Sequence, residues 1–292
     1  MRTFLAWLAC LALYSPAALA AAPHSEATPR AEPSVPRLDH VIVVIMENRS
    51  YDQTRHASYT ASLIASGSSF SASTAITHPS LPNYLALWSG STQGVTDDAC
   101  PPAGSPYAVE NLGHACEASG RTWRTYSEDL PATGSQVCAA NGRLYTRKHD
   151  PWTEFSNLDH SCERAYPDLA RAIAGDSLPN LAFVIPNNCH NTHDEHACDV
   201  AAGDAWLAAN LPKMISAAGP RGLVILTWDE DDFTVANRIL TVFSGPGVKR
   251  GYVSARPITH YTVLRTLCDA LDLPAFGAGA KEAPITDVWL KE

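Results

Sequence analysis

The sequence predicts an α/β fold, a three-layer α/β/α sandwich in which helices cover both faces of a mostly parallel central sheet. Three runs of apolar, often β-branched residues carry this prediction, at 40–46, 181–185 and 223–228. None of them alternates between apolar and polar residues, and such runs are typical of strands that are buried on both faces. Stretches with helical spacing lie between the runs, which is the element order of an α/β protein.

The remaining elements follow from the same patterns. A fourth strand is expected at 239–243, because the turn residues Ser244-Gly245-Pro246-Gly247 end that run. Apolar residues recur with a helical period in five stretches. These are residues 58–65, 82–88, 166–174, 201–218 and 260–271.

The N-terminus has the three parts of a secretory signal. Arg2 precedes an apolar run at 4–13, and Ala18-Leu19-Ala20 offers small residues for cleavage after Ala20. The run is shorter than the roughly 20 residues of a membrane span, and no other segment is apolar enough to be one. We therefore expect a signal peptide at 1–20, a flexible leader rich in Ala, Pro, Ser and Glu at 21–36, and one domain at 37–292, in a periplasmic or secreted protein.

Cysteine usage agrees with an oxidising compartment. Of the 8 cysteines, Cys10 leaves with the signal, and Cys268 lies on the apolar face of a predicted helix, where we expect a free core thiol. The other six could form three bridges. Proximity in the sequence suggests Cys100 with Cys116, Cys138 with Cys162, and Cys189 with Cys198, although spacing does not determine connectivity.

Composition excludes several classes of function. The chain has 292 residues, of which 46% are hydrophobic, so disorder over most of its length is excluded. With 30 acidic against 21 basic residues and a net charge of -9, it lacks the basic surface that nucleic acid requires. An anionic substrate would need a metal ion or local dipoles to offset this charge.

Polar clusters directly follow three of the predicted strands. They are Glu47-Asn48, residues 186–194 and residues 229–232. Carboxyl ends of parallel strands meet at one edge of an open sheet, where ligands bind, so the three clusters are expected to converge. Carboxylate and amide oxygens suit Mg, Ca or Mn, whereas the histidines of the second cluster suit Zn or Fe, and the mixture does not select one metal. The common zinc motifs are absent.

Ser80 is the candidate nucleophile. It stands just before Pro82 at the start of a predicted helix, where Ser and Pro are also ordinary capping residues. The same position lets the unpaired N–H groups of the helix N-terminus bind a phosphoryl group beside the Ser80 hydroxyl. A metal ion on that hydroxyl would lower its pKa, and Asn83 could donate its amide to a phosphoryl oxygen.

At these residues the sequence resembles the phosphoesterase family of bacterial phospholipases C and secreted acid phosphatases, within the alkaline phosphatase superfamily. The resemblance spans about 40–273, and its most specific part is Met-Glu-Asn-Arg-Ser-Tyr-Asp at 46–52. The segments that carry it are 40–52, 77–84, 148–151, 186–194, 227–232 and 259–261. It implies an alkaline-phosphatase-like fold.

The resemblance also implies a mechanism. Ser80 would attack phosphorus, and water would hydrolyse the resulting phosphoseryl intermediate. One or two divalent metal ions would be bound by Glu47, Asn48, Ser80, Asp229 and Glu230. His193, Asp194 and His260 resemble the second metal site or the leaving-group side of the superfamily pattern. His149 would contact the phosphoryl group or protonate the leaving oxygen, a role that suits the pKa of histidine.

Two segments depart from the family pattern. Asn187 and Asn188 stand where an aspartate is expected, which favours a single tightly held metal ion. Asp150 stands where an asparagine is expected, and its charge could alter the affinity for phosphate.

The sequence also offers alternatives to this function. The Gly175-Asp176-Ser177-Leu178 segment spells a lipase and esterase signature, but it precedes a strand and has the composition of a loop. The leading prediction is an acid phosphatase acting on small phosphomonoesters. The first alternative is a phospholipase C or another phosphodiesterase with a phospholipid headgroup as substrate, and the second is a non-catalytic metal- or glycan-binding protein.

A phospholipase would need an apolar or aromatic rim around its site. The region 99–159 has six aromatic residues that could form such a rim or could equally belong to the core. They are Tyr107, Trp123, Tyr126, Tyr145, Trp152 and Phe155.

Overall fold

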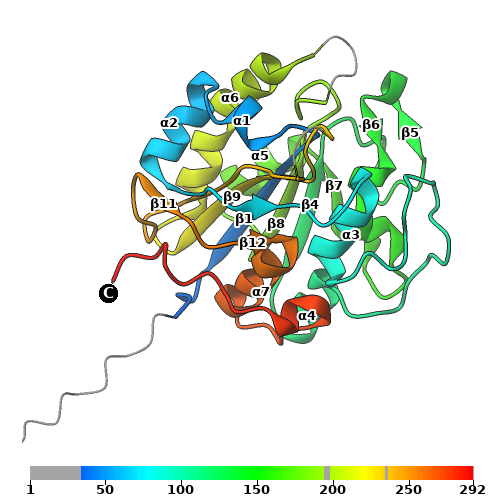
Figure 1. Ribbon diagram of the computed structural model, residues 1–292. Coiled ribbons are helices and arrows are strands. Elements are labelled where there is room, and N and C mark those ends of the chain that lie inside the picture. Colours follow the sequence, from blue (N-terminus) through cyan, green and yellow to red (C-terminus); the bar gives the residue numbers. More distant parts are fainter. Residues whose placement is uncertain (1–33, 194–197, 234–235, 292) are drawn as a thin grey trace, which may run out of the picture. The chain divides into compact units, whose positions relative to one another are not determined.

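The computed structural model describes residues 34–193, 198–233 and 236–291. Its main sheet has eight strands in the order β11-β2-β10-β9-β1-β8-β4-β7. Figure 1 labels six of them, with β1, β8 and β9 in the middle of the molecule. The central strands β1 (His40–Met46), β8 (Leu181–Ile185) and β9 (Gly222–Trp228) are the three that the apolar runs predict. β1 pairs in parallel with both β8 and β9, and β8 pairs in parallel with β4 (Trp123–Ser127).

Only β10 (Thr241–Ser244) runs against its neighbours among these eight strands of the described chain. It is antiparallel to β9 on one side and to β2 (Ser68–Phe70) on the other. The outer pairs, β2 with β11 (Tyr252–Ser254) and β4 with β7 (Glu163–Ala165), are parallel. The sheet is therefore mostly parallel, as predicted.

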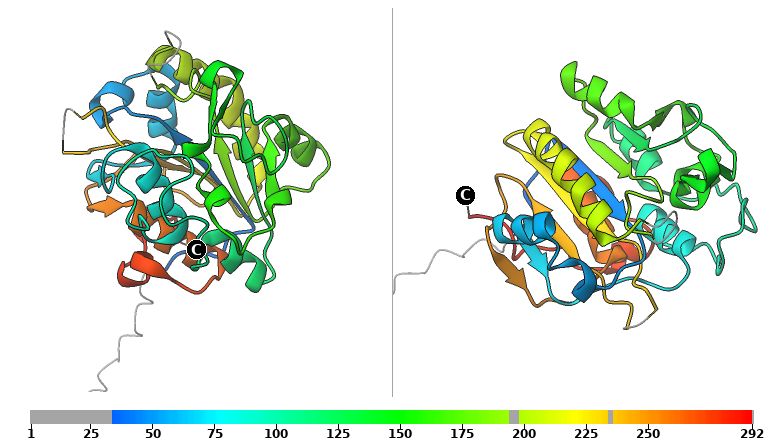
Figure 2. Two further views of the ribbon diagram at one scale, coloured as in Figure 1. Left: turned by 90° about the vertical axis from the view of Figure 1, so that its right-hand side faces the viewer. Right: turned by 90° about the horizontal axis from the view of Figure 1, so that it is seen from above.

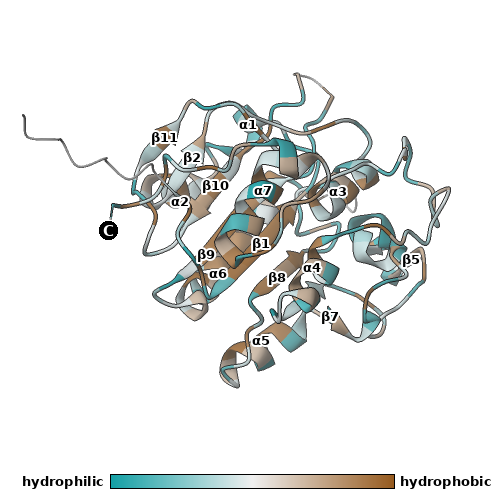
Figure 3. Ribbon diagram, turned by 90° about the horizontal axis from the view of Figure 1, so that it is seen from below, coloured by the Kyte–Doolittle hydropathy of each residue, from teal (hydrophilic) through white to brown (hydrophobic). Residues whose placement is uncertain are grey.

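Helices cover both faces of the sheet (Figure 2). Side chains of β1 alternate between two cores: Val41, Val43 and Ile45 face one, and Ile42 and Val44 face the other. The first core contains α3 (Ser80–Ser89), α4 (Leu112–Ala118) and α7 (His260–Leu271). The second contains α2 (Ser58–Ser66), α5 (Pro167–Ala174) and α6 (Val200–Ala218). This is the predicted three-layer sandwich, and Figure 3 shows its apolar residues concentrated on the central strands.

Shorter elements complete the chain. They are α1 (Tyr51–Thr54), the paired strands β3 (Ser73–Thr74) and β12 (Ile258–Thr259), the hairpin β5 (Ala139–Ala140) and β6 (Tyr145–Thr146), and the 3₁₀ turns η1 (Asn141–Arg143), η2 (Arg147–His149), η3 (Pro151–Glu154), η4 (His160–Cys162) and η6 (Gly277–Lys281). Two of the predicted elements begin two residues away from their predicted start, and the other predicted boundaries agree to within one residue. The predicted helix 82–88 begins at Ser80, so Ser80 lies in its first turn, and the predicted strand 239–243 becomes Thr241–Ser244.

The disulfide prediction is partly wrong. Cys189 pairs with Cys198 as expected, but Cys100 pairs with Cys138, across 38 residues, and not with Cys116. Cys116 and Cys162 are free cysteines, and Cys116, on α4, is buried in the core. Burial raises the pKa of the Cys116 thiol to about 12, so it resists oxidation. The buried free thiol expected at Cys268 is confirmed.

The predicted signal peptide at 1–20 and residues 21–33 of the predicted leader lie outside the described residues. Val35, near the end of that predicted leader, packs against the main core, so the folded domain extends slightly upstream of residue 37. Among the described residues, no helix is both long and apolar enough to cross a membrane.

Candidate active site

The polar clusters that follow β1 and β9 meet at the carboxyl edge of the sheet. Met46 and Trp228, the last residues of these strands, are direct neighbours in the register. The backbone N–H of Asp229 donates to the Met46 carbonyl at 3.0 Å, and the Asn48 N–H donates to Asp229 Oδ1 at 3.3 Å. Asn48 has φ of +39°, a left-handed conformation that Asn adopts more readily than most residues. The predicted convergence of these two clusters is therefore observed.

Ser80 lies over this edge in the first turn of α3. Its hydroxyl donates to Glu47 Oε2 at 3.1 Å and lies 3.3 Å from Glu230 Oε1. The Ser80 side chain is fully buried, but its neighbours are charged groups and not the apolar core. Helix α3 thus brings its positive N-terminal end and a hydroxyl to the acidic edge of the sheet.

Glu47 is the most tightly held carboxylate of the group. Tyr84, one turn after Ser80 on α3, donates its hydroxyl to Glu47 Oε1, and His149 Nε2 lies 3.1 Å from the same oxygen. Burial raises the pKa of Glu47, but the charges of His149 and Lys148 outweigh burial and lower it to about 2. Glu47 is therefore ionised at neutral pH.

The pKa values of the other two carboxyl groups, Asp229 and Glu230, are raised and not lowered. Burial, followed by the charges of Glu47 and Glu230, raises the pKa of Asp229 well above its ordinary value. Burial and the Glu47 charge raise the pKa of Glu230 to about 8. Three carboxyl groups at one edge therefore lack the positive charge that would keep all of them ionised.

Two oxygen atoms in the cluster fit a cation. Asn48 Oδ1 and Asp229 Oδ2 are buried and accept no hydrogen bond from the described residues. Buried oxygens without a donor are costly unless a cation or a water molecule binds them. The described chain contains no group of three His, Cys, Asp or Glu side chains already arranged for a metal ion. Glu47, Asp229 and Glu230 are therefore not already gathered in such a group. Together with Asn48 and Ser80 they offer only oxygen donors, and an all-oxygen set suits Mg, Ca or Mn.

Asn83 holds the segment before Ser80 in place. Its Oδ1 accepts hydrogen bonds from the backbone N–H groups of Ile76 and Thr77, both at 3.0 Å. Its Nδ2 donates to the carbonyls of Thr77 at 2.8 Å and Pro79 at 3.1 Å. The structure thus gives Asn83 a positioning role, and its donation to a phosphoryl oxygen stays a prediction.

The histidines expected at the site lie around its margin. His149 is buried, and its ring stacks on Tyr84 with centroids 5.3 Å apart, so it supports Glu47. His260 is also buried. Its Nε2 lies 2.7 Å from the Asp229 carbonyl, and burial lowers its pKa to about 4. The neutral ring therefore positions the third cluster, and its role as a metal ligand stays a prediction.

The second cluster is only partly described. Asp194 lies outside the described residues. His193 is half-buried, and it lies on the Glu47 side of the site, because Thr192, the residue before it, donates its hydroxyl to the Glu47 carbonyl at 2.8 Å. Asn187 donates its side-chain amide to Asp129 Oδ2 at 2.7 Å, which directs it away from Ser80. Its Oδ1 accepts from Cys189 N at 3.0 Å. Asn187 therefore holds its own loop.

Asp150 is directed toward the sheet interior. Ser127, at the end of β4, donates its hydroxyl to Asp150 Oδ1 at 2.7 Å. Burial raises the pKa of Asp150 to about 7. These contacts do not support the predicted effect of its charge on phosphate affinity.

His78 is a site residue that sequence reasoning missed. Its Nδ1 lies 2.6 Å from Glu230 Oε2, and its Nε2 lies 3.3 Å from Asp231 Oδ1. Phe233 stacks on the His78 ring with centroids 3.9 Å apart and is 67% exposed, with φ of +63°. Left-handed backbone at a bulky residue is unusual and clusters at functional sites.

Lys148 and Asp98 were also missed as site residues. Lys148 Nζ lies 3.4 Å from Ser80 Oγ and 2.9 Å from Asp98 Oδ2. Lys148 adjoins His149 in a segment already singled out, whereas nothing in the sequence around Asp98 indicates a role.

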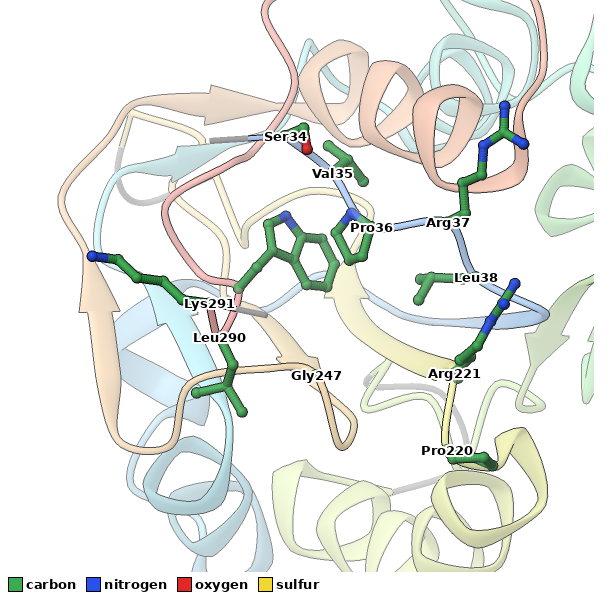
Figure 4. Close-up of a pocket in the computed structure, with 12 residues that line it drawn as sticks. Ser34, Val35, Pro36, Arg37, Leu38, Pro220, Arg221, Gly247, Leu290 and Lys291 are labelled. Atoms are coloured by element: carbon green, nitrogen blue, oxygen red, sulfur yellow. The ribbon is translucent and has the colours of Figure 1, made fainter. Parts of the chain in front are cut away.

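A well-formed pocket elsewhere lacks comparable chemistry. It has a volume of about 560 Å³ and lies at the amino ends of β1 and β9, the edge of the sheet opposite to Ser80 (Figure 4). Its two arginines are already paired: Arg37 with Asp272 and Arg221 with Asp39, both at 2.8 Å. This pocket is not the site of the chemistry.

The six aromatic residues between 99 and 159 belong to the interior. All are buried, so they do not form a lipid-binding rim; their exposed fractions are 9% for Tyr107, 2% for Trp123, 1% for Tyr126, 3% for Tyr145, and 0% for Trp152 and Phe155.

The fold places the chain in a known class. It is similar to a protein of the alkaline phosphatase superfamily from Vibrio parahaemolyticus, with a TM-score of 0.59 and 11% identity over 80% of this chain and 66% of that one. It is also similar to the phosphonate monoester hydrolase of Agrobacterium radiobacter, with a TM-score of 0.54 and 12% identity over 81% and 74% of the two chains. These likenesses establish the alkaline-phosphatase-like fold.

Sequence relatives then give the family. The phosphoesterase family model matches residues 54–274. The chain is 40% identical over 260 residues to the phosphatidylinositol-3-phosphatase of Mycobacterium tuberculosis, covering 88% of this chain and 84% of that protein. It is 26% identical over 262 residues to a probable acid phosphatase of Kluyveromyces lactis, covering 84% of this chain but only 61% of the yeast protein. The chain belongs to the phosphoesterase family and is a hydrolase of phosphoric esters.

Proposed function

We propose that this hydrolase is metal-dependent and cleaves phosphomonoesters through a phosphoseryl intermediate on Ser80. The observation that carries the proposal is the Ser80 hydroxyl, 3.1 Å from Glu47 Oε2 and 3.3 Å from Glu230 Oε1, at the N-terminus of α3. The proposed metal donors are Glu47, Asn48, Ser80, Asp229 and Glu230. A divalent cation bound there would neutralise the carboxylates and lower the pKa of the serine hydroxyl.

The chain's own residues supply the remaining chemistry. Glu47 is ionised and accepts the hydrogen bond of the Ser80 hydroxyl, so it orients that oxygen for attack on phosphorus. With a pKa of about 2, Glu47 is a weak base, so the proposed acceptor of the serine proton is the ionised form of Glu230, which lies 3.3 Å from Ser80 Oγ and has a pKa of about 8. The Lys148 ammonium, 3.4 Å from Ser80 Oγ, favours negative charge on that oxygen. His193, half-buried beside Glu47, is the proposed donor of a proton to the leaving oxygen, because His149 is already held against Glu47.

The substrate proposal favours a monoester over a diester. The aromatic residues that could have formed a phospholipase rim are buried in the core. The relatives of the chain include acid phosphatases and a phosphatase named for a phosphoinositide. The exposed ring of Phe233 beside His78 offers apolar contact next to the phosphate, which favours a substrate with an aryl or acyl group close to its phosphate. A lipid phosphomonoester is therefore the second candidate.

One comparative assay tests these alternatives. The purified protein, supplemented with Mg²⁺, Mn²⁺ or Ca²⁺, is assayed on p-nitrophenyl phosphate, bis-p-nitrophenyl phosphate, phosphatidylinositol 3-phosphate and phosphatidylcholine. The proposal predicts release of inorganic phosphate from p-nitrophenyl phosphate and from the 3-phosphate monoester of phosphatidylinositol 3-phosphate, dependence on the cation, and loss of turnover in Ser80→Ala. Preference for phosphatidylcholine would support a phospholipase C. Turnover that Ser80→Ala leaves unchanged would refute the role of Ser80, and a chain that binds metal without any turnover would be a binding protein.

We also propose a location outside the cytoplasm. The two disulfides support it, since structural disulfides form and persist in oxidising compartments. Fractionation of cells that express the full chain tests this: the protein is expected in the periplasm or the medium, shortened by about the 20 residues of a signal.

A further inference from the structure

The N-terminal end of α3 already holds an internal anion. Asp98, in the loop after α3, accepts a hydrogen bond from the Leu81 N–H to Oδ1 at 3.0 Å. Its other oxygen, Oδ2, lies 2.9 Å from Lys148 Nζ. The two donors flank Ser80, since Leu81 follows it in the chain and Lys148 Nζ lies 3.4 Å from Ser80 Oγ.

These donors are of the kind that phosphoryl oxygens bind. Backbone N–H groups in the first turn of a helix and a lysine ammonium are both common ligands of phosphate. A phosphorus atom attacked by Ser80 Oγ lies beside that oxygen. Lys148 Nζ, 3.4 Å from Ser80 Oγ, and the N–H of the next residue, Leu81, border the region in which its other oxygens lie. The two oxygens of the Asp98 carboxylate bind these same two donors.

Lys148 and Asp98 lie closer to solvent than Ser80 does, as the exposed fractions of their side chains show. The Ser80 side chain is fully buried, whereas the side chains of Lys148 and Asp98 are 15% and 29% exposed. The ion pair is therefore part of the cover between Ser80 and solvent, and a substrate that reaches Ser80 has to displace at least one of its members.

We propose that Lys148 and the Leu81 amide bind phosphoryl oxygens, and that Asp98 occupies their place in the free protein as an internal competitor of phosphate. This inference rests on the proposed function of Ser80 and adds to it two residues that recognise the phosphoryl group. Asp98 lowers the affinity for phosphate, and Lys148 raises it.

The backbone around the pair is fixed, so side-chain rotation is sufficient for the exchange. The Cys100–Cys138 disulfide begins two residues after Asp98 and ties its loop to the β5 strand region. The N–H of Arg147, beside Lys148, donates to the Cys138 carbonyl at 3.0 Å. Both partners are therefore tethered at Cys138.

A purely structural role for Asp98 makes the opposite prediction. If its carboxylate only caps α3 and holds Lys148 in position, neutralising it should leave phosphate affinity unchanged or weaken it. Asp98→Asn separates the two roles, because asparagine keeps an oxygen that caps a helix but removes the charge. Asp97→Asn is the matched control, since Asp97 is the exposed neighbouring residue and caps only the Ala99 N–H, at 3.1 Å.

The experiment measures binding of inorganic phosphate by isothermal titration calorimetry, with Mg²⁺ present and without turnover. The proposal predicts at least about fivefold tighter binding to Asp98→Asn, as expected when a charge-assisted hydrogen bond no longer competes. Asp97→Asn should bind as the wild type does. Lys148→Met should bind at least about tenfold more weakly.

Each other outcome overturns the proposal. The proposal is wrong if phosphate binds Asp98→Asn with unchanged or lower affinity, or if it binds Lys148→Met as it binds the wild type. It is also wrong if Asp97→Asn tightens binding as much as Asp98→Asn does, or if phosphate binds neither the wild type nor Asp98→Asn. If Asp98→Asn does not fold, as judged by circular dichroism, Lys148→Met decides alone. Turnover of p-nitrophenyl phosphate is measured separately: the predicted binding pattern without turnover would refute the hydrolase mechanism but keep the anion site.

Discussion

Glu230 provides a quantitative test of the charge balance at the site. It is buried, it lies 3.3 Å from Ser80 Oγ and 2.6 Å from His78 Nδ1, and burial together with the Glu47 charge raises its pKa from 4.5 to about 8. Between these values the folded protein binds a proton that the unfolded chain does not. The stability from this group is thus fully present below pH 4.5 and is lost as the pH rises through about 8.

The perturbation is Glu230→Gln, which removes the titrating group and keeps its shape. From pH 6.5 to 8 the cation-free wild type should lose about 1.5 kcal/mol more free energy of unfolding than the variant, since one pKa unit corresponds to about 1.4 kcal/mol. This window avoids His260, whose pKa of about 4 makes its contribution constant above pH 6.5.

Urea unfolding with a chelator present, at pH 6.5 and pH 8, gives the two differences. With Mg²⁺ or Mn²⁺ in place of the chelator, the wild type should no longer lose stability with rising pH, because a bound cation favours the ionised carboxylate. Parallel pH profiles for the wild type and Glu230→Gln without cations would refute this account of the site.

Three further predictions concern the supports of the site and the fold. Tyr84→Phe removes the hydroxyl that donates to Glu47 Oε1, so the free energy of unfolding at pH 7 should fall by about 2 kcal/mol in urea titrations; an unchanged value would show that this contact does not matter. His260 contributes stability that is fully present above pH 6.5 and lost as the pH falls toward 4. Over that range the free energy of unfolding of the wild type should fall by about 3 kcal/mol more than that of His260→Asn. Equal losses in the two proteins would contradict the burial of His260 as a neutral ring. Asp204 on α6 accepts hydrogen bonds from Tyr59 N and Thr60 N at 2.8 Å and from Thr60 Oγ1 at 2.7 Å. Asp204→Ala should therefore lower the free energy of unfolding by about 3 kcal/mol without changing KM. A loss below about 1 kcal/mol would show that other contacts hold α2 in place.

The interior of the fold could be predicted because its signal is local. β1, β8 and β9 are buried on both faces, and continuous apolar runs are the direct consequence. β2, β7 and β11 were missed because they have three residues each and owe their conformation to pairing with neighbouring strands. A strand of three residues is too short to show a periodic pattern, and the strands that pair with it lie far away in the sequence.

The site was predictable where chain position and chemistry coincide. Glu47 and Asp229 directly follow neighbouring parallel strands, so their meeting follows from topology. Tyr84 could have been found from its spacing, since residues four apart lie on one face of a helix and Ser80 is in the first turn. Asp98 could not, because loop packing brings it to Lys148 across 50 residues.

The disulfide error has a similar origin. Sequence proximity favoured a bridge between Cys100 and Cys116, but α4 places Cys116 in the core, with no exposed surface. The loop after α3 instead meets the β5 region, where Cys138 lies. Separation along the chain is a poor guide when secondary structure directs one cysteine inward.

The central claim is that one cation binds the oxygens of Glu47, Asn48, Ser80, Asp229 and Glu230. A crystal structure of the protein grown with Mn²⁺, with data collected at the manganese absorption edge, measures this directly. The account predicts an anomalous peak about 2.0–2.4 Å from Ser80 Oγ and from oxygens of the neighbouring carboxylates. A fully occupied manganese ion elsewhere, with Ser80 still donating its hydrogen bond to Glu47, would contradict it.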